Sequence, residues 1–377
     1  MKSYVFTRTD TKIMKGVAIL LMLMHHLWGF PERQPGGAYA IRSPVFPQVL
    51  GKEWFAAVGQ FGKICLPVFM FLTGYGMYRQ YESGKLSVER KIGRFYISYW
   101  KTASVMLAAA FLFFRSQEQL ISGKRDFSRL YSSVHQQDLA MTLIGFSKKY
   151  NLEWWYAGCF VIAVLFGYLY ILLTRKLHNG YIELFIGFVI CLTAYQILPM
   201  LKDVPSFAWM KEDALYNFYL KQGCVGEIYA GITFARYHAL DRAMTAVMSW
   251  NVPSRIAFSL AGGLVIFNLR AMNDRYQQYF YILTPAFVIV SMNLIRLIRF
   301  LDRPLAFLGA HSENLWLTHS FFCYYFSFFV KIVYASGNAF ADLAVLLALS
   351  LAASLLIEAF CALAGKMVRA VSGRVSS

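Results

Sequence analysis

The chain has 377 residues, enough for two or three soluble domains of ordinary size. Its composition excludes that organisation, because 58% of the residues are hydrophobic and 15% are charged, whereas soluble domains carry about 25% charged residues. The net charge of +17 is compatible with a nucleic-acid binder, and also with a membrane protein whose cytoplasmic loops are rich in lysine and arginine. The apolar content predicts an all-α, polytopic membrane protein.

Ten apolar stretches are candidates for transmembrane helices, which need about 20 mostly apolar residues to cross the hydrocarbon core. In chain order they cover residues 13–30, 58–78, 96–114, 154–173, 181–200, 215–235, 255–269, 279–295, 305–334 and 341–363. The seventh stretch is short, and the ninth is long enough to tilt or break. The chain is predicted to form a single integral-membrane domain over residues 1–377, with its core at about 11–365.

The placement of positive charge predicts the orientation of these helices. With the N-terminus in the cytoplasm, the inward connections and the two tails hold 20 of the 37 lysines and arginines. Short cytoplasmic loops are expected to be the richer ones. We therefore predict that both termini are cytoplasmic, and that the basic excess reflects topology in a bilayer and no nucleic-acid partner.

The first apolar stretch contains the most informative polar residues. Lys15 and His26 are eleven residues apart, which on an α-helix is about 20° more than three full turns and a rise of about 16 Å. One helix face then presents a cation near the inner surface and an imidazole towards the outer one, while His25 points about 100° away. A functional pair and a snorkelling lysine beside interfacial histidines both fit this pattern.

A basic cluster and a glycine pair mark the next two spans. Arg90, Lys91 and Arg94 precede the third span at its cytoplasmic end. They fit a phosphate-binding patch, since clustered Arg and Lys bind phosphates by charge-assisted hydrogen bonds, and they also fit topology anchors. Gly74 and Gly76 in the second span predict close approach of another helix backbone.

Polar residues also mark the fourth span and the ninth stretch. Glu153 and Trp154 open the fourth span from the outside, where an aromatic surface beside a carboxylate suits a sugar ring and also fits an interfacial belt. Ser312 and His319 belong to a segment with too many hydrogen-bonding side chains for a lipid-facing helix. The six cysteines lie in apolar runs without a CxxC pair, so no metal site is predicted.

Four of these patterns, in this order, resemble the motifs of the membrane-bound acyltransferase 3 family. The family has an Arg or Lys followed after ten residues by His in its first helix, here Lys15 and His26. An aromatic–Ser/Thr–Gly second helix corresponds to residues 69–75, the basic motif to residues 90–94, and a late Gly–Ser–Leu–His segment to residues 309–319. The resemblance extends from about residue 11 to the last span, and its spacing favours His26 over His25 as the functional histidine.

The resemblance implies an integral-membrane O-acyltransferase in the plasma membrane. Such an enzyme moves an acyl group, usually acetyl, from cytosolic acyl-CoA to a hydroxyl of an extracytoplasmic glycan or lipid-linked sugar. It would bind no cofactor, with acetyl-CoA as a co-substrate. The alternative is a multi-pass transporter or flippase that moves a sugar or lipid without making a bond.

The same resemblance implies a division of roles. His26 would act as the general base on the acceptor hydroxyl or would carry the acyl group briefly. Glu153 would orient the histidine or bind the acceptor. The residues expected to hold the phosphates of acyl-CoA are Lys15, Arg90, Lys91 and Arg94. Those expected to line the acceptor cavity are His25, Trp154, Ser312 and His319.

Overall fold

A computed structural model describes residues 3–35, 53–121, 126–201, 203–211, 226–272 and 280–375. The regular structure in these ranges is helical, apart from one isolated β-bridge between Pro35 and Ile121. The all-α prediction is therefore confirmed for this part of the chain. The first part of the sixth predicted span, residues 215–225, lies outside the described residues.

Within the described ranges, six helical segments are long and apolar enough to cross a membrane. They are Trp54–Glu82, Leu152–Thr174, Gly180–Ile197, Val252–Arg270, Phe280–Leu297 and Ala339–Lys366. These segments coincide with the second, fourth, fifth, seventh, eighth and tenth predicted spans. The first and third are also helical, as α1 (Arg8–Trp28) and α4 (Val88–Phe113), but their lysines, arginines and histidines make them more polar. The protein is thus a multi-pass membrane protein; ten spans and cytoplasmic termini stay predictions.

The ninth apolar stretch is broken into several short helices. It forms α13 (Asp302–Ala310), α14 (Ser312–Ser320), a π-helical turn over Phe321–Tyr325, and α15 (Ser327–Val333). The Gln117 side chain bridges the break, because its amide nitrogen donates to the Tyr325 carbonyl at 2.6 Å and its oxygen accepts from the Ser327 amide at 2.9 Å. Backbone groups freed at membrane depth need such partners.

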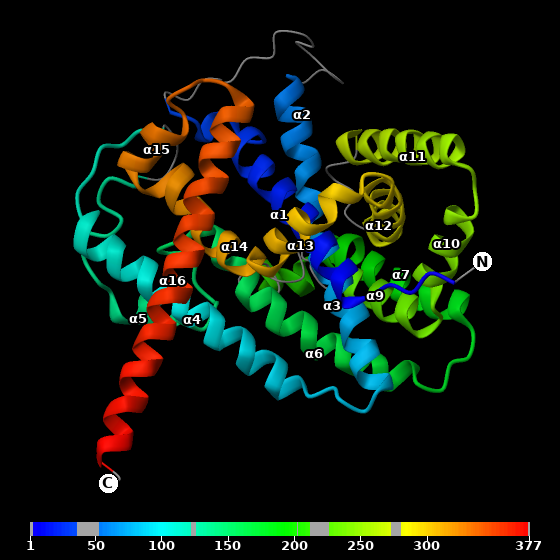
Figure 1. Ribbon diagram of the computed structural model, residues 1–377. Helices are drawn as coiled ribbons and strands as arrows, with labels where there is room; N and C mark the ends of the chain where they lie inside the picture. Colours follow the sequence, from blue (N-terminus) through cyan, green and yellow to red (C-terminus); the bar gives the residue numbers. More distant parts are fainter. Residues whose placement is uncertain are drawn as a thin grey trace. The chain divides into compact units, whose positions relative to one another are not determined.

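The helices form two compact units, each built from three separate stretches of chain. The first unit comprises Met1–Met22, Gln60–Ile92 and Tyr156–Ala310, and the second comprises Leu23–Gly59, Gly93–Trp155 and His311–Ser377. In addition to part of α1 and to α13, the first unit contains α3 (Cys65–Glu82), α6 (Tyr156–Thr174), α7 (Gly180–Leu192), α9 (Gly226–Arg236), α10 (Ala239–Met248), α11 (Val252–Met272) and α12 (Phe280–Leu297). In Figure 1, α11 and α12 lie side by side within this unit.

Glycines set the closest helix contacts in the first unit. A Cβ atom at Gly74 of α3 would collide with the Ile228 carbonyl oxygen of α9, and one at Gly231 of α9 would collide with the Phe71 carbonyl oxygen of α3. The predicted close approach at Gly74 is confirmed. The prediction for Gly76 is wrong, because a Cβ there would meet nothing within 4 Å. Gly76 lies on another face of α3, two residues and about 200° away from Gly74.

A second glycine pair joins the first half of α1 to α13. A Cβ at Gly309 would collide with the Lys12 carbonyl oxygen, and one at Gly16 would collide with the Leu305 carbonyl oxygen. The two backbones therefore touch near Lys15. Gly309 begins the late motif of the sequence, so its small size has a packing reason here.

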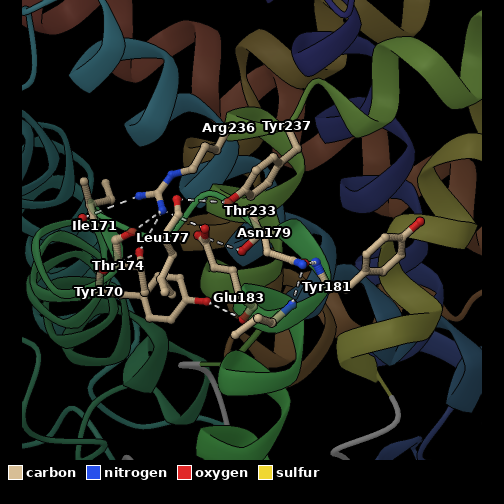
Figure 2. A network of polar contacts seen from close by, with 11 residues as sticks. Tyr170, Ile171, Thr174, Leu177, Asn179, Tyr181, Glu183, Thr233, Arg236 and Tyr237 are labelled. Atoms are coloured by element: carbon tan, nitrogen blue, oxygen red, sulfur yellow. Dashed lines mark hydrogen bonds and ion pairs between the residues drawn. The ribbon is translucent and has the colours of Figure 1, made fainter.

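A buried ion pair connects α6, α7 and α9 (Figure 2). Arg236 Nη1 lies 2.6 Å from Glu183 Oε2, and it also donates to the Thr174 carbonyl oxygen at 2.8 Å. Thr233 donates to the other Glu183 oxygen at 3.0 Å. The Glu183 side chain is fully buried and that of Arg236 is 9% exposed. Arg236 therefore links three helices inside the first unit.

The second unit contains the end of α1, most of α2 (Trp54–Phe61) and α4, α5 (Gln136–Leu143), α14, α15 and α16 (Ala339–Val375). Figure 1 shows α14 beside the long α16, and their contact includes Asn314, whose side-chain nitrogen donates to Ser354 at 3.0 Å. Thr102 of α4 donates to the Asn314 oxygen at 2.9 Å. One amide therefore links three helices of this unit.

The end of α5 lies along α4. The backbone carbonyls of residues 142–144, at the end of α5, accept hydrogen bonds of 2.6 to 2.9 Å from Tyr96, Tyr99 and Trp100. The last carbonyls of a helix have no partner within that helix, so these three side chains satisfy them. They have a specific structural role beyond that of an interfacial aromatic belt.

Candidate functional site

His26 lies near the end of α1 among aromatic side chains of the second unit. Its ring centroid is 4.7 Å from that of His319, 5.9 Å from that of Tyr324 and 6.2 Å from that of Phe30. The Tyr324 hydroxyl donates to the His26 carbonyl oxygen, and the hydroxyl oxygen is 3.5 Å from His26 Nδ1. The residue as a whole is partly exposed.

His319 is fully buried, and its tautomer follows from its hydrogen bond. The Nδ1 atom lies 2.8 Å from the Trp316 carbonyl oxygen, which can only accept, so Nδ1 carries the hydrogen. The neutral ring then has its lone pair on Nε2, and this atom has no hydrogen-bond partner among the described residues. A buried acceptor therefore stands unsatisfied next to His26, which indicates a place for a donor from a ligand or from His26 itself.

His25 has a different environment from His26. Its Nδ1 atom donates to the Gly59 carbonyl oxygen at 2.8 Å, and the residue is 7% exposed. This bond lies where α1 meets α2, since a Cβ at Gly59 would collide with the backbone of Gly29. The structure thus uses one ring nitrogen of His25 to hold two helices together, while His26 meets His319.

Glu153 is buried and both of its carboxylate oxygens are engaged. Oε1 lies 3.0 Å from Arg33 Nη1, and Oε2 accepts from the Tyr325 hydroxyl at 2.8 Å. The Glu153 backbone oxygen accepts from the indole of Trp316 at 3.2 Å. Within the described chain Glu153 makes no hydrogen bond to His26, so the orientation of the histidine expected from the sequence is not direct.

The π-helical turn brings two successive tyrosines to this site. Tyr324 contacts His26, and the next residue, Tyr325, bonds to Glu153. Such turns interrupt α-helices and often occur at functional sites. The Arg33 guanidinium lies over the Tyr324 ring, with its carbon atom 5.3 Å from the ring centroid.

The other two residues expected in the acceptor cavity are buried. The indole nitrogen of Trp154 donates to the Leu317 carbonyl oxygen at 3.0 Å, and the residue is fully buried. Ser312 begins α14 and is 6% exposed. In this geometry Trp154 packs between helices of the second unit.

The basic residues of the donor prediction divide into two groups. Lys91 is partly buried, and this burial and the neighbouring charge of Lys15 lower the pKa of Lys91 to about 8. Arg90 and Arg94 lie one turn apart on α4 and are exposed. Within the part of the chain that the structure describes, Lys91, Arg90 and Arg94 have no carboxylate partner. The charge of Lys15 therefore acts on Lys91, which places these two cations near each other in the first unit.

The structure thus brings His26 and His319 together in one unit, and Lys15 and Lys91 in the other. Sequence reasoning missed Arg33, Tyr324 and Tyr325. Arg33 looked like any outer-loop cation, and the tyrosines lie in an aromatic run that reads as an ordinary apolar span. The one available signal for Arg33 was its position directly after a helix that carries a polar face.

The chain is thus a multi-pass membrane protein that brings two imidazoles, those of His26 and His319, together in its second unit. Among the described residues, no group of three or more His, Cys, Asp or Glu side chains is placed to hold a metal ion. Residues 10–359 match the acyltransferase 3 family, whose description is "acyltransferase domain", and the chain belongs to this family. The protein is therefore an acyltransferase for groups other than aminoacyl groups, with an acyl donor as co-substrate. No curated protein and no solved structure matches the chain.

Proposed function

We propose that the protein transfers an acyl group, in the first instance acetyl, from cytosolic acyl-CoA to a hydroxyl of an extracytoplasmic glycan or lipid-linked sugar at the plasma membrane. The observation that carries this proposal is the contact between His26, near the end of α1, and His319 of α14, with Lys15 three turns before His26 on the same face of α1. Lys15 and His26 are separated by a rise of about 16 Å along the helix. This separation suits a donor whose phosphates stay at the cytoplasmic surface while its thioester reaches into the membrane.

The donor end of the proposal rests on charge. Acyl-CoA carries several phosphate charges, and Lys15 and Lys91 are two cations close enough for the charge of one to act on the other. Arg90 and Arg94 add two exposed guanidinium groups at the N-terminal end of α4, where the helix dipole also favours an anion.

The acyl-transfer end rests on the two imidazoles. His26 takes the proton of the acceptor hydroxyl as the hydroxyl oxygen attacks the thioester carbon. The imidazolium that forms needs a hydrogen-bond acceptor, and His319 Nε2 supplies an unsatisfied one beside it. The proton then goes to the leaving thiolate, so the products are the ester and CoA thiol. An acyl group carried briefly by His26 uses the same atoms and is the alternative order of events.

The test uses membranes of cells that make the native glycan, incubated with radiolabelled acetyl-CoA. Wild-type protein is expected to release CoA thiol and to place a base-labile label in the glycan fraction. His26→Ala should abolish both signals, while His178→Ala, a change at an exposed histidine, should leave them intact. Label moved across the membrane without His26-dependent thiol release would instead indicate a transporter and would refute the proposal.

His319 has a sharper test of its own. His319→Ala removes the acceptor, whereas His319→Gln keeps an oxygen that accepts a hydrogen bond. The glutamine variant should therefore retain more activity than the alanine variant at equal expression. Equal activity of the two variants would contradict the role given to Nε2.

A further inference from the structure

Arg33 is held rigidly beside the candidate active site. It ends a single 3₁₀ turn, Pro31–Arg33, that follows α1. Its Nη1 atom pairs with Glu153 at 3.0 Å, and its guanidinium lies over two aromatic rings, 4.6 Å from the centroid of Phe30 and 5.3 Å from that of Tyr324. A planar cation fixed by a carboxylate and two rings has little rotamer freedom left to lose when it binds something else.

Arg33 has more hydrogen-bond donors than its partners in this unit require. A guanidinium has five N–H donors. Glu153 accepts from Nη1 of this one, and the hydroxyl oxygen of Tyr324 also lies within hydrogen-bonding reach of the guanidinium. The Arg33 side chain is 34% exposed whereas that of Glu153 is 5% exposed, so the guanidinium, with more N–H donors than these two partners need, is the member of the pair that a ligand can reach.

Arg33 and His26 both contact the rings of Phe30 and Tyr324. Phe30 and Tyr324, over which the guanidinium lies, also contact the His26 ring. A reacting group next to the His26 ring is therefore also next to a preorganised cation.

Acyl transfer from a thioester needs a partner for a transient negative charge. When the acceptor oxygen attacks, the carbonyl oxygen of the thioester becomes an oxyanion, and fixed donors aimed at that position provide the largest stabilisation in comparable enzymes. We propose that Arg33 donates to this oxyanion, and that Glu153 and Tyr325 are positioning residues that hold the guanidinium in place. This inference rests on the proposed function.

The step balances without any further reactant. The acceptor hydroxyl gives its proton to His26, its oxygen forms a bond to the thioester carbon, and the carbonyl electron pair moves to the oxygen that faces Arg33. The pair then returns, the carbon–sulfur bond breaks, and the thiolate takes the proton from His26. Arg33 keeps all of its protons throughout, as its high pKa requires.

Glu153 is suited to the positioning role because it is itself fixed on every side. Tyr325 donates to its second carboxylate oxygen at 2.8 Å, and the Tyr325 hydroxyl accepts from the Leu152 amide at 2.8 Å. The Glu153 amide donates to the Asn151 side chain at 2.9 Å. Glu153 therefore cannot follow Arg33 if Arg33 moves, and the ion pair between them would break.

The main test measures kcat and KM separately for Arg33→Ala and for Arg129→Ala, an exposed arginine of the same unit. We expect Arg33→Ala to lower kcat by about 10²- to 10³-fold, with the KM values for acetyl-CoA and for the glycan fraction nearly unchanged. Hydrolysis of acetyl-CoA by water should fall in parallel, because it forms the same oxyanion. Added ethylguanidinium should restore part of the rate in Arg33→Ala, which a purely structural arginine would not allow.

Two further variants keep the proposal testable if Arg33→Ala does not fold. Arg33→Lys keeps the charge but loses the planar fork, and should lower kcat by about tenfold at unchanged thermal stability. Tyr325→Phe should lower kcat with unchanged KM values, and the loss should not be rescued by ethylguanidinium, since Arg33 is still present.

Unchanged kcat in Arg33→Lys and Arg33→Ala would overturn the assignment, as would an effect confined to the KM of the glycan, which would place Arg33 in an acceptor subsite. These outcomes are distinct from failure of the proposed function. That failure would be seen in the wild-type protein, as the absence of His26-dependent transfer, before any Arg33 variant is compared.

Discussion

The charge state of Lys91 offers a direct test of the donor site. Lys91 lies before the apolar part of α4, and burial together with the charge of Lys15 lowers the pKa of Lys91 to about 8. At pH 7 about ten in eleven copies of Lys91 carry the charge, and at pH 9 about one in eleven. If only the charged form binds the phosphates of acyl-CoA, the apparent KM for the donor should rise by up to about tenfold over this interval.

The direction of this effect follows from linkage. A bound polyanion raises the pKa of Lys91 again, so above pH 8 Lys91 takes up a proton when the donor binds. Donor binding therefore weakens as the pH rises, and the KM increases. The donor phosphates do not confuse the measurement, because their own ionisation is complete near pH 7. Proton transfer at His26 also depends on pH, but it belongs to kcat, so the two constants must be measured separately.

The assay is donor-dependent release of CoA thiol by wild-type and variant membranes at several pH values. Lys91→Arg keeps its charge throughout, so its KM for acetyl-CoA should stay flat between pH 7 and 9. Lys91→Gln should show a high and equally flat KM. A rise in KM that is the same in wild type and in Lys91→Arg would refute the reasoning, since it would have to come from another group.

Three more predictions concern the donor face and the packing. Lys15→Gln should raise the KM for acyl-CoA about tenfold. Lys12→Gln, a change at an exposed lysine one turn earlier on the same helix, should leave this KM within about twofold of the wild-type value. Equal effects of the two substitutions would contradict a specific donor site at Lys15. Glu183→Gln leaves its buried arginine without a counter-charge and should destabilise the protein by about 3–5 kcal/mol, read as a lower Tm in detergent; an unchanged Tm would mean that the pair is not buried as described. Gly74→Ala should lower the free energy of unfolding by about 3 kcal/mol, because the new Cβ meets a backbone carbonyl of α9, whereas Gly76→Ala, in open space, should stabilise α3 by about 0.5–1 kcal/mol. Tm values in the opposite order would contradict the packing of α3 on α9.

Much of the membrane architecture follows from local properties of the chain. The bilayer requires long apolar helices whose backbone groups are paired internally, so composition and length identify most of them. The ninth stretch shows where this reasoning ends. It is apolar enough to look like one span, but its hydrogen-bonding residues and the π-helical turn at Phe321–Tyr325 divide it, and the partner that makes the break possible, Gln117, is 208 positions away from Tyr325 in the chain.

The candidate site divides in the same way. That Lys15 and His26 share a helix face is a consequence of the α-helical repeat and needed no tertiary information. Which residues meet His26 did need it, because His319, Tyr324 and Arg33 reach the imidazole or its neighbours only through the way α1, α14 and the π-helical turn pack together.

By itself, then, the sequence determined that this is a helical membrane protein whose first helix has lysines near its start and histidines near its end, and its ordered motifs placed it in a family of acyltransferases. The tertiary structure alone decided that His25 is tied to Gly59, that His319 offers an unsatisfied nitrogen beside His26, and that Glu153 is paired with Arg33. The physical reason is the distance along the chain between the residues that interact. Helix periodicity and burial in a bilayer act between near neighbours in the chain, whereas the pairing of Glu153 with Arg33, 120 residues apart, depends on how separate helices pack.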